Sequence, residues 1–342
     1  MNSQPLKKAL DCLKIIPSEI DIDSKALYME SDGDNMTLRC FSDNSSGKVI
    51  IPCDLELEQC VIDIDLFYKV IKSVGVEVIL DLKDGKDNSK ILTVESGGSK
   101  FKLICFEKKI NNKLPDFLEE VDFNPKSTYD LLRKASVFSD PTSSFIQLRS
   151  VYSIDDLSFT ASPFRITVLN KNPFKEKISY SPKLVDFLSK IDGTSKISLN
   201  SNFLRVKNDN LEFIFSINKD GSIPAINKYL TMKSDCSDKL DVELLNQILN
   251  KFSVFNPTEI LFSSDGVGKV KISGTDMLKT SLDSIFDSKF NKKFTIKLDF
   301  AKFKESLKIF DEGVKFEIFE PPDMIRLSEG EVVQILSTIV DE

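Results

Sequence analysis

The sequence predicts an α+β protein made of three tandem similar modules, each with two helices packed on antiparallel sheets. Two observations indicate this fold class. Amphipathic helical patterns recur six times along the 342 residues, and strand-like alternation with turn residues fills the intervals between them. The helices alternate between two positions in a unit of about 115 residues, so the chain carries a threefold internal repeat without sequence identity between its copies.

The six helical patterns begin near Pro5, Asp63, Lys126, Ser181, Asp241 and Asp299. The segment from Lys126 to Phe138 illustrates them. Leu132 and Ala135 fall on one apolar face of the helix, whereas Arg133 lies away from it. Three starts offer an aspartate as N-cap, and Ser181 is a cap followed by a proline at the first helical position. We therefore expect amphipathic helices that cover a sheet with one face.

Strand patterns lie on both sides of the second helix of each unit. Before it we expect hairpins, from Asn35 to Phe41 and Lys48 to Pro52 around a turn at 43–47, from Leu157 to Thr160 and Arg165 to Leu169, and from Lys269 to Ile272 after Asp265-Gly266. After it we expect a three-stranded meander in each unit. Its strands run from Glu77 to Leu82, Lys90 to Glu95 and Lys100 to Phe106; from Lys196 to Leu199, Phe203 to Lys207 and Leu211 to Phe215; and from Val314 to Phe319, Met324 to Leu327 and Val332 to Leu336.

The repeat places the module boundaries near residues 120 and 232. The predicted modules are 1–120, 121–232 and 233–342. The connections are short and polar, from Lys113 to Asp122 and from Thr231 to Lys239. Such short connections predict a rigid row of modules rather than domains on flexible linkers.

The composition argues against catalysis and against a bound cofactor. The chain has no histidine, so it lacks the commonest general base and the commonest transition-metal ligand. The six cysteines form no CxxC pair, which favours free, mostly buried thiols over disulfides or a metal site. Asp63-Ile64-Asp65 and Asp32-Gly33-Asp34-Asn35 have metal-like spacings, but helix capping and turn chemistry explain them. We predict a protein that is not an enzyme and needs no metal.

Two glycine segments suggest nucleotide loops without completing them. Gly266-Val267-Gly268 lacks the third glycine and the following helix of a dinucleotide loop, and Gly47-Lys48 lacks the upstream glycine of a phosphate-binding loop. Neither predicts a nucleotide site. The N-terminal segment carries lysines inside its apolar run, and no stretch approaches about 20 apolar residues. We therefore expect a soluble protein of the cytoplasm that has no membrane partner.

Charge is distributed unevenly between helices and strands. The six helical windows contain fourteen basic and nine acidic residues, although the whole chain has a formal net charge of −7. The basic residues are Lys7, Lys8, Lys14, Lys69, Lys72, Lys126, Arg133, Lys134, Lys183, Lys190, Lys251, Lys302, Lys304 and Lys308. In one interpretation lysine merely favours solvated helix faces. In the other, the helices present these cations to the phosphates of double-stranded DNA without reading its sequence.

The repeat, the basic helices and four sequence segments together resemble the bacterial-type β sliding clamp, the DNA polymerase III β subunit family. The segments are Phe159 to Val168, similar to a family strand-turn-strand with Arg165; Lys113-Leu114-Pro115-Asp116-Phe117, similar to the end of its first domain; Gly221-Ser222-Ile223-Pro224, at the place of a Gly-x-Phe-Pro turn; and Val332 to Leu336, similar to its last strand. The architectural resemblance covers the whole chain.

The resemblance implies a function in DNA replication. It implies a head-to-tail homodimer that closes a ring around duplex DNA, a processivity factor placed there by a clamp loader and tethering a DNA polymerase. It also implies a hydrophobic pocket for a short peptide of each partner. Carried over residue by residue, that pocket comprises Arg165, Ile166, Leu230, Met232, Leu336 and Ile339; these residues also fit a plain domain-interface core.

The sequence also departs from the family pattern. Pro163-Phe164 stands where the family commonly has a glycine and a histidine, and Thr338-Ile339-Val340 replaces its usual Pro-x-Arg ending. These departures fit a divergent clamp, including one encoded by a phage and acting in the cytoplasm of the host cell. Two alternatives stay open at this stage: a monomeric replication scaffold that forms no ring, and, more remotely, a nuclease that uses carboxylate-bound metal.

Overall fold

The computed structural model describes residues 1–17, 25–85, 89–106, 115–117, 119–139, 143–219, 224–319 and 324–339. Within these ranges the chain repeats one order of elements three times, namely a helix, four strands, a second helix and three strands. The second and third copies carry one additional strand before the first helix. The predicted α+β class with helix pairs on antiparallel sheets is confirmed.

The first copy comprises α1 (Ser3–Leu13), β1 (Ala26–Asp32), β2 (Asn35–Ser42), β3 (Ser45–Pro52), β4 (Glu56–Asp63), α2 (Ile64–Ser73), β5 (Ile79–Asp84), β6 (Lys90–Ser96) and β7 (Ser99–Cys105). The second comprises β8 (Val121–Phe123), α3 (Pro125–Ser136), β9 (Val151–Ile154), β10 (Leu157–Ser162), β11 (Arg165–Leu169), β12 (Ile178–Tyr180), α4 (Pro182–Leu188), β13 (Ser195–Leu199), β14 (Phe203–Lys207) and β15 (Leu211–Asn218).

The third copy follows a short helix, α5 (Asn227–Thr231). It comprises β16 (Cys236–Asp241), α6 (Val242–Phe252), β17 (Glu259–Asp265), β18 (Lys269–Thr275), β19 (Ser281–Asp287), β20 (Lys293–Asp299), α7 (Phe300–Ser306), β21 (Gly313–Phe319), β22 (Met324–Glu329) and β23 (Val332–Ser337). Short 3-10 turns at Ile146–Leu148 and Leu307–Ile309 complete the described elements.

The six predicted helices are all present, and their caps follow the sequence. The side chains of Asp63, Asp241 and Asp299 each accept a hydrogen bond from a main-chain N–H in the first turn of α2, α6 and α7. Ser181 caps α4, and Pro182 is its first residue. Each cap satisfies a donor that the helix itself leaves without a partner.

Three predictions of local structure need correction. The turn expected at 43–47 is shorter, because Ser45, Ser46 and Gly47 already belong to β3. The connection expected from Thr231 to Lys239 contains the start of β16, which pairs with β21. The short helix α5 was not expected. Part of the segment from Lys113 to Phe117, residues 221–223 of the Gly221 turn, and Val340 lie outside the described residues.

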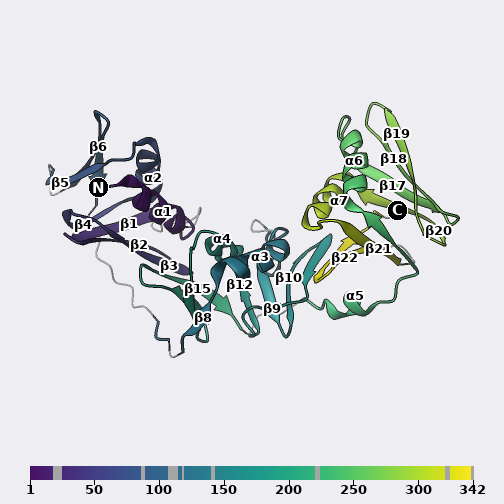
Figure 1. The fold of residues 1–342 in the computed structure, drawn as a ribbon, viewed down its shortest axis with the longest axis horizontal. Helices are drawn as coiled ribbons and strands as arrows, with labels where there is room; N and C mark the ends of the chain where they lie inside the picture. The colour runs from purple at the N-terminus through teal and green to yellow at the C-terminus, as the bar shows by residue number, and fades with distance from the viewer. Residues whose placement is uncertain are drawn as a thin grey trace. The chain divides into compact units, whose positions relative to one another are not determined.

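The chain divides into two compact units. The first comprises Met1–Asp130 and Tyr180–Asp220. Its larger sheet has the strand order β4-β1-β2-β3-β15-β14-β13-β8, and its smaller sheet has the order β5-β6-β7. Helices α1 and α2 lie side by side against the larger sheet (Figure 1). Leu6, Leu10 and Phe67 on their inner faces are fully buried.

The second unit comprises Leu131–Ser179 and Gly221–Glu342. Its larger sheet has the order β16-β21-β22-β23-β11-β10-β9, and its smaller sheet has the order β19-β18-β17-β20. Five phenylalanines form its core around Phe262, which stacks on Phe316 with ring centroids 4.9 Å apart and meets Phe286, Phe294 and Phe303. Stacked and edge-on phenylalanine rings therefore fill the core of this unit.

In each unit, a larger sheet forms where one copy of the repeat pairs with the next. In the first unit, β3 pairs antiparallel with β15, and in the second unit β11 pairs antiparallel with β23. In both cases the third strand of one copy meets the last strand of a neighbouring copy. The corresponding strands that remain are β19 and β7, and among the described residues each is the edge strand of a smaller sheet.

Candidate functional site

Helices α1 and α2 and the segment that follows α4 are joined in the first unit by polar contacts around Asp11. The Asp11 carboxylate accepts hydrogen bonds from Lys72 Nζ at 2.8 Å and Tyr68 Oη at 2.9 Å, and Lys190 Nζ donates to the Asp11 carbonyl at 2.8 Å. Burial works to raise the pKa of Asp11, but the hydrogen bonds from Lys72 and Tyr68 outweigh it, so this pKa lies below its ordinary value. Lys72 and Tyr68 of α2 and Lys190 after α4 thus hold these elements against α1.

Most of the fourteen predicted DNA-facing cations have partners inside the chain. Five form ion pairs, namely Lys8 with Asp192, Lys14 with Asp65, Lys72 with Asp11, Lys134 with Asp311 and Lys302 with Asp299. Lys7, Lys183 and Lys190 donate to the carbonyls of Val74, Pro17 and Asp11, and Lys304 donates to Ser253 Oγ. These nine residues contribute to packing between elements, a role that the charge count alone did not reveal.

The other five cations are exposed. They are Lys69, Lys126, Arg133, Lys251 and Lys308. Lys69, Lys251 and Lys308 form no hydrogen bond or ion pair with any residue that the structure describes. Each of the helices α2, α3 and α6 carries at least one of these cations, and Lys308 follows α7 directly. They are the members of the predicted set that are most available to an external phosphate.

The alternation of β11 separates two residues of the predicted peptide pocket. Arg165 and Ile166 are neighbours, so their side chains point to opposite faces of the sheet. The Arg165 guanidinium stacks 3.6 Å from the centre of the Phe138 ring and donates to Glu305 at 3.0 Å and Ser306 at 3.3 Å. Burial outweighs the Glu305 contact and lowers the pKa of Arg165. Arg165 joins the helices to the sheet and does not reach the face of Ile166.

Ile166 and Leu230, two residues of the predicted pocket, both lie on an apolar surface between two buried clusters. One cluster contains Tyr152, Phe159, Val168 and Ile226, and the other contains Phe319, Met324 and Ile335. Both residues pack against both clusters and are only partly buried, as is Val333. We call the exposed parts of Ile166, Tyr229, Leu230 and Val333 the linker surface. Tyr229 and Val333 were missed; Val333 lies on the same face of β23 as Ile335, the ladder partner of Ile166, and on the face opposite to the predicted Leu336.

Arg326 fixes the linker surface in place. Its Nη1 donates to the carbonyls of Tyr229, Leu230 and Met232 at 3.2, 2.9 and 3.2 Å, while Nε and Nη2 donate to the buried carboxylate of Glu317. Burial works to raise the pKa of Glu317, but the hydrogen bonds from Arg326 and Lys315 outweigh it and lower this pKa. No sequence pattern indicated this contact, because its acceptors are main-chain atoms.

The remaining pocket residues lie elsewhere. Leu336 is opposite Arg165 in the ladder and is 4% exposed. With Ile339 it lines a separate cavity of about 230 Å³, together with Phe164, Lys302 and Phe303. Met232 is 43% exposed and contributes only its carbonyl to Arg326. The structure therefore brings together Ile166 with Leu230, and Leu336 with Ile339, but not all six residues.

The other predicted features have structural explanations. Asp32 Oδ1 accepts from the N–H groups of Asp34 and Asn35 in a tight turn, and Asp63 caps α2. Five of the six cysteines are buried, and all six are free thiols. Among the described residues, no group of three His, Cys, Asp or Glu side chains is placed to hold a metal ion. In the same residues, no helix combines the length and apolarity that a membrane-spanning helix requires.

Solved structures similar over the full length are bacterial sliding clamps. DNA polymerase III subunit β from Pseudomonas aeruginosa superposes with a TM-score of 0.82 at 13% sequence identity, covering 99% of this chain and 98% of that one. The DNA polymerase sliding clamp from Bacillus subtilis gives 0.83 at 12%, covering 100% and 98%. DNA polymerase III subunit β from Borrelia burgdorferi, solved in complex with a natural product, gives 0.82 at 15%, covering 100% and 98%.

The sequence itself matches no protein-family model and no curated protein. The similarity therefore lies in the fold, which is that of the bacterial DNA polymerase III β sliding clamps. The resemblance predicted from the sequence is confirmed at this level, across the whole chain.

Proposed function

We propose that this chain is a DNA sliding clamp, a processivity factor of DNA replication that acts without catalysis. Two copies form a head-to-tail ring around duplex DNA. The observation that carries this proposal is the pairing pattern of the repeat. Two of its three junctions are made within the chain, by β3 with β15 and by β11 with β23, while β19 and β7 are edge strands in the part of the chain that the structure describes. A second copy supplies the missing partner for each edge, as in a closed cyclic assembly.

The repeat also indicates how the two edges align. Leu27 on β1 pairs with Ile62, the residue before the N-cap of α2. Ile260 on β17 pairs with Leu298, the residue before the N-cap of α7. Leu27 and Ile260 therefore occupy equivalent places in the repeat. Leu27 pairs with Cys40, which pairs with Gly47 on β3. In the same way, Ile260 pairs with Gly274, which pairs with Leu282 on β19, so Gly47 and Leu282 are equivalent. The position of Leu282 in the ring junction is therefore that of Gly47 in the β3–β15 ladder.

The same reasoning applies to the other strand. Phe213 on β15 and Phe101 on β7 are both the third residue after a two-residue hairpin turn. Because Gly47 pairs with Phe213, Leu282 of one copy is expected opposite Phe101 of the other. Lys100 then faces Asp283, at the place where Glu212 faces Lys48 within the chain. An apolar pair and an opposite-charge pair thus support this register.

Exposed apolar side chains at these two edges agree with ring closure. Ile104 on β7 is 64% exposed, and Ile285 on β19 is 62% exposed. A long exposed edge with apolar side chains is a liability unless another strand covers it. The three predicted modules, 1–120, 121–232 and 233–342, would then become six modules in the closed ring.

Within the ring, the exposed cations Lys69, Lys126, Arg133, Lys251 and Lys308 would meet the phosphates of DNA. Contacts of this kind do not depend on the base sequence, so they are compatible with sliding. The predicted set of fourteen is thereby reduced to these five as direct contacts. The other nine support the helices that carry them.

The linker surface is proposed to bind the peptide of a DNA polymerase and of other partners. Ile166, Tyr229, Leu230 and Val333 offer partly exposed apolar side chains on a support that Arg326 holds rigid. A fixed apolar surface bordered by main-chain polar groups suits a short hydrophobic peptide. Placement on DNA by a clamp loader and action in the cytoplasm belong to the same proposal. The similar bacterial structures give no support to a phage origin.

Retention on circular DNA tests this function. The protein is loaded onto nicked circular DNA and onto the same DNA made linear, and its dissociation is followed in 0.5 M salt by gel filtration. A ring is retained on the circle because only opening releases it, whereas it slides off linear ends. Equal retention on both, together with a monomer in light scattering, would favour the non-ring scaffold instead.

A further inference from the structure

The smaller sheet of the first unit has a second open edge, on the side opposite β7. Strand β5 pairs only with β6 among the described residues. Its counterparts in the other copies are covered on both sides, because β8 pairs with β13 and β16 pairs with β21. Both covering strands come directly before the first helix of their copy. In the first copy, the only pairing before α1 among the described residues is the bridge of Asn2 with Glu77.

The main chain of β5 offers free hydrogen-bonding groups on this edge. Val78 donates to the Met1 carbonyl at 3.0 Å and accepts from the Met1 amino group at 2.9 Å. Because strand main-chain groups alternate with a period of two, those of Leu80, Leu82 and Asp84 point to the same side. No described residue bonds them there. They can receive an added strand that runs antiparallel to β5, in continuation of the Met1 contact.

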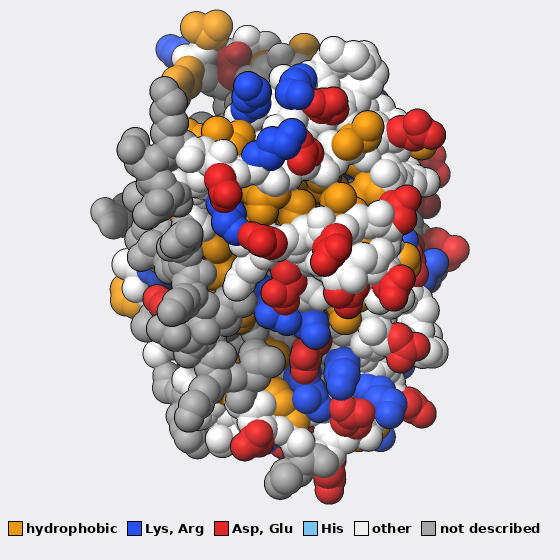
Figure 2. All heavy atoms as spheres, turned by 90° about the vertical axis from the view of Figure 1, so that its left-hand side faces the viewer, with side chains coloured by type: hydrophobic (Ala, Val, Ile, Leu, Met, Phe, Trp, Pro, Cys, Tyr) orange, Lys and Arg blue, Asp and Glu red, His pale blue; other side chains and the backbone are white. Residues whose placement is uncertain are grey.

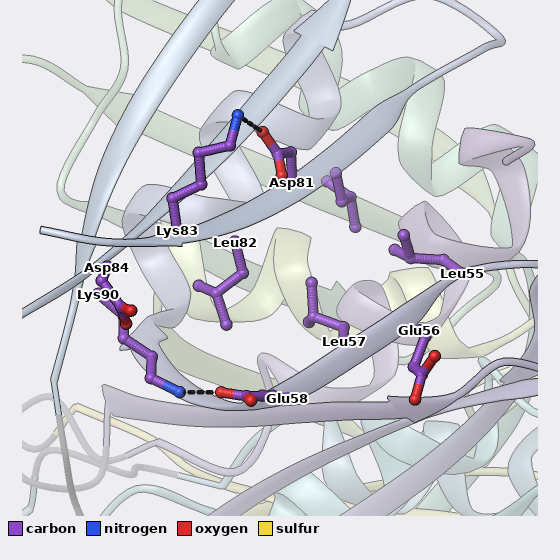
Figure 3. A pocket seen from close by; sticks show the side chains of 10 residues that line it. Leu55, Glu56, Leu57, Glu58, Asp81, Leu82, Lys83, Asp84 and Lys90 are labelled. Atoms are coloured by element: carbon purple, nitrogen blue, oxygen red, sulfur yellow. Dashed lines mark hydrogen bonds and ion pairs between the residues drawn. The ribbon is translucent and has the colours of Figure 1, made fainter.

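A cavity lies directly along this edge. It has a volume of about 570 Å³ and is lined by Leu55 to Glu58 at the start of β4 and by Leu80 to Asp84 on β5. Leu55, Leu57 and Leu82 point into it (Figure 3). Figure 2 looks onto this end of the first unit and shows apolar side chains exposed between acidic ones. Cavities of this size accept peptide side chains.

The border of the cavity is acidic. It carries four carboxylates, Glu56, Glu58, Asp81 and Asp84, and two lysines. Lys83 is paired with Asp81 at 2.7 Å, and Lys90 is paired with Glu58 (Figure 3). Glu56 and Asp84 are exposed and form no ion pair with a described residue. A ligand with lysine or arginine beside apolar residues would complement these two charges, whereas a nucleic acid would be repelled.

We propose that the β5 edge is a docking site for a basic, extended peptide segment of a partner protein. The segment adds as a fourth strand, its alternate apolar side chains enter the leucine-lined cavity, and its cations meet Glu56 and Asp84. This site is separate from the linker surface. Since β5 and β7 are opposite edges of the sheet, its occupation is compatible with ring closure and does not depend on it.

The proposal is tested with a fluorescent acetylated peptide of alternating valine and lysine, of the same length as β5, added to the full 342-residue chain. Fluorescence anisotropy is expected to show saturable binding that weakens as salt rises. The double variant Glu56→Lys/Asp84→Lys is expected to bind about tenfold more weakly. A matched variant of exposed acids elsewhere, Glu119→Lys/Asp122→Lys, keeps the affinity. Circular dichroism checks that both variants are folded.

Strand addition is separated from simple charge attraction by N-methylation. One peptide is methylated on every second amide and another on the alternate amides. One of the two is expected to lose binding, because its methyl groups face β5, and the other to keep it. Equal binding by both peptides, no binding of the parent peptide at millimolar concentration, or equal affinity for the reversed-charge variant would each overturn the proposal. Loss of retention on circular DNA would leave it untouched.

Discussion

Strands β11 and β23 are paired at a junction inside the chain, whereas the equivalent strands β19 and β7 lie at open edges of their sheets. At the junction, Leu336 is 4% exposed, and the fully buried Gln334 donates to Thr167 Oγ1 at 3.1 Å. At the edges, Ile285 and Ile104 are more than 60% exposed. The chain thus completes the two junctions between consecutive copies of the repeat, and among the described residues it leaves β19 and β7 unpaired with each other. What distinguishes the two regions is the absence of a partner strand among the described residues, since the residue types are similar.

The largest expected effect is on the stability of the completed junction. Leu336→Ala should lower the free energy of unfolding by about 2 to 5 kcal/mol, because it leaves a cavity in a close-packed region. Ile104→Ala, at an open edge, should change the free energy of unfolding of the monomer by no more than about 0.5 kcal/mol. Urea denaturation at a concentration that keeps the protein monomeric measures both. Equal losses would mean that the edge is already covered.

A second effect concerns the buried carboxylate of Glu317, which binds Arg326 beneath the linker surface. The lowered pKa of Glu317 means that its stabilising contribution is present above the ordinary glutamate pKa and is lost as the pH falls through the lowered value. Glu317→Gln should therefore cost about 2 kcal/mol at neutral pH. The difference from the unaltered protein should shrink in acid. A difference that stays constant from pH 7 to pH 3 would contradict this role.

A smaller effect is expected from the charge pair proposed across the open edges. Lys100→Glu and Asp283→Lys should each weaken self-association several-fold, because like charges then face each other. The double variant Lys100→Glu/Asp283→Lys should recover most of the lost self-association, because opposite charges face each other again. Sedimentation equilibrium gives the association constants for this double-mutant cycle. Additive losses in the double variant would reject the register, since Lys100 also contacts Glu95 and Asp283 contacts Lys271 within the chain.

The smallest expected effect distinguishes cations that bind a partner within the chain from exposed cations that bind none among the described residues. Lys251 on α6 has no partner among the described residues, whereas Lys304 on α7 donates to Ser253 Oγ at 2.6 Å. Lys251→Ala should reduce the slope of log affinity for DNA against log salt by about one, because one phosphate is no longer neutralised. Lys304→Ala should change the slope less and the stability more. Identical slopes for Lys251→Ala and the unaltered protein would remove Lys251 from the DNA contacts.

Local chemistry explains which parts of the fold were predictable. The helix starts at Asp63, Asp241 and Asp299 follow from a cap that the sequence displays directly. The start of β16 was hidden because Cys236–Asp241 is mostly polar and becomes a strand only by pairing with β21. Gly47 was assigned to a turn, yet it is required inside β3. A Cβ atom there would lie 2.6 Å from the Phe213 ring and 2.9 Å from Leu13.

The candidate sites were predictable only where a local sequence pattern determines the position of a side chain. Ile166 and Leu230 of the predicted pocket pack against the same two clusters, while the opposite direction of Arg165 was available from strand periodicity and was overlooked. The contact of Arg326 with three linker carbonyls depends on the tertiary fold alone. Likewise, a count of helix lysines cannot distinguish Lys72, which is paired with Asp11, from Lys69, which has no ion pair with a described residue.

A disulfide cross-link tests the proposed ring closure most directly. Ser99 and Ser284 are expected to face each other across the junction, at a position equivalent to Leu211 and Val49. Strand neighbours of this kind bring their Cβ atoms close enough for a disulfide. The variant Ser99→Cys/Ser284→Cys should form a cross-linked dimer on mild oxidation, seen on a non-reducing gel. The variant Ser99→Cys/Thr280→Cys, which is out of register, should form none. A dimer band of equal strength in both variants, or in neither, would contradict closure through β7 and β19.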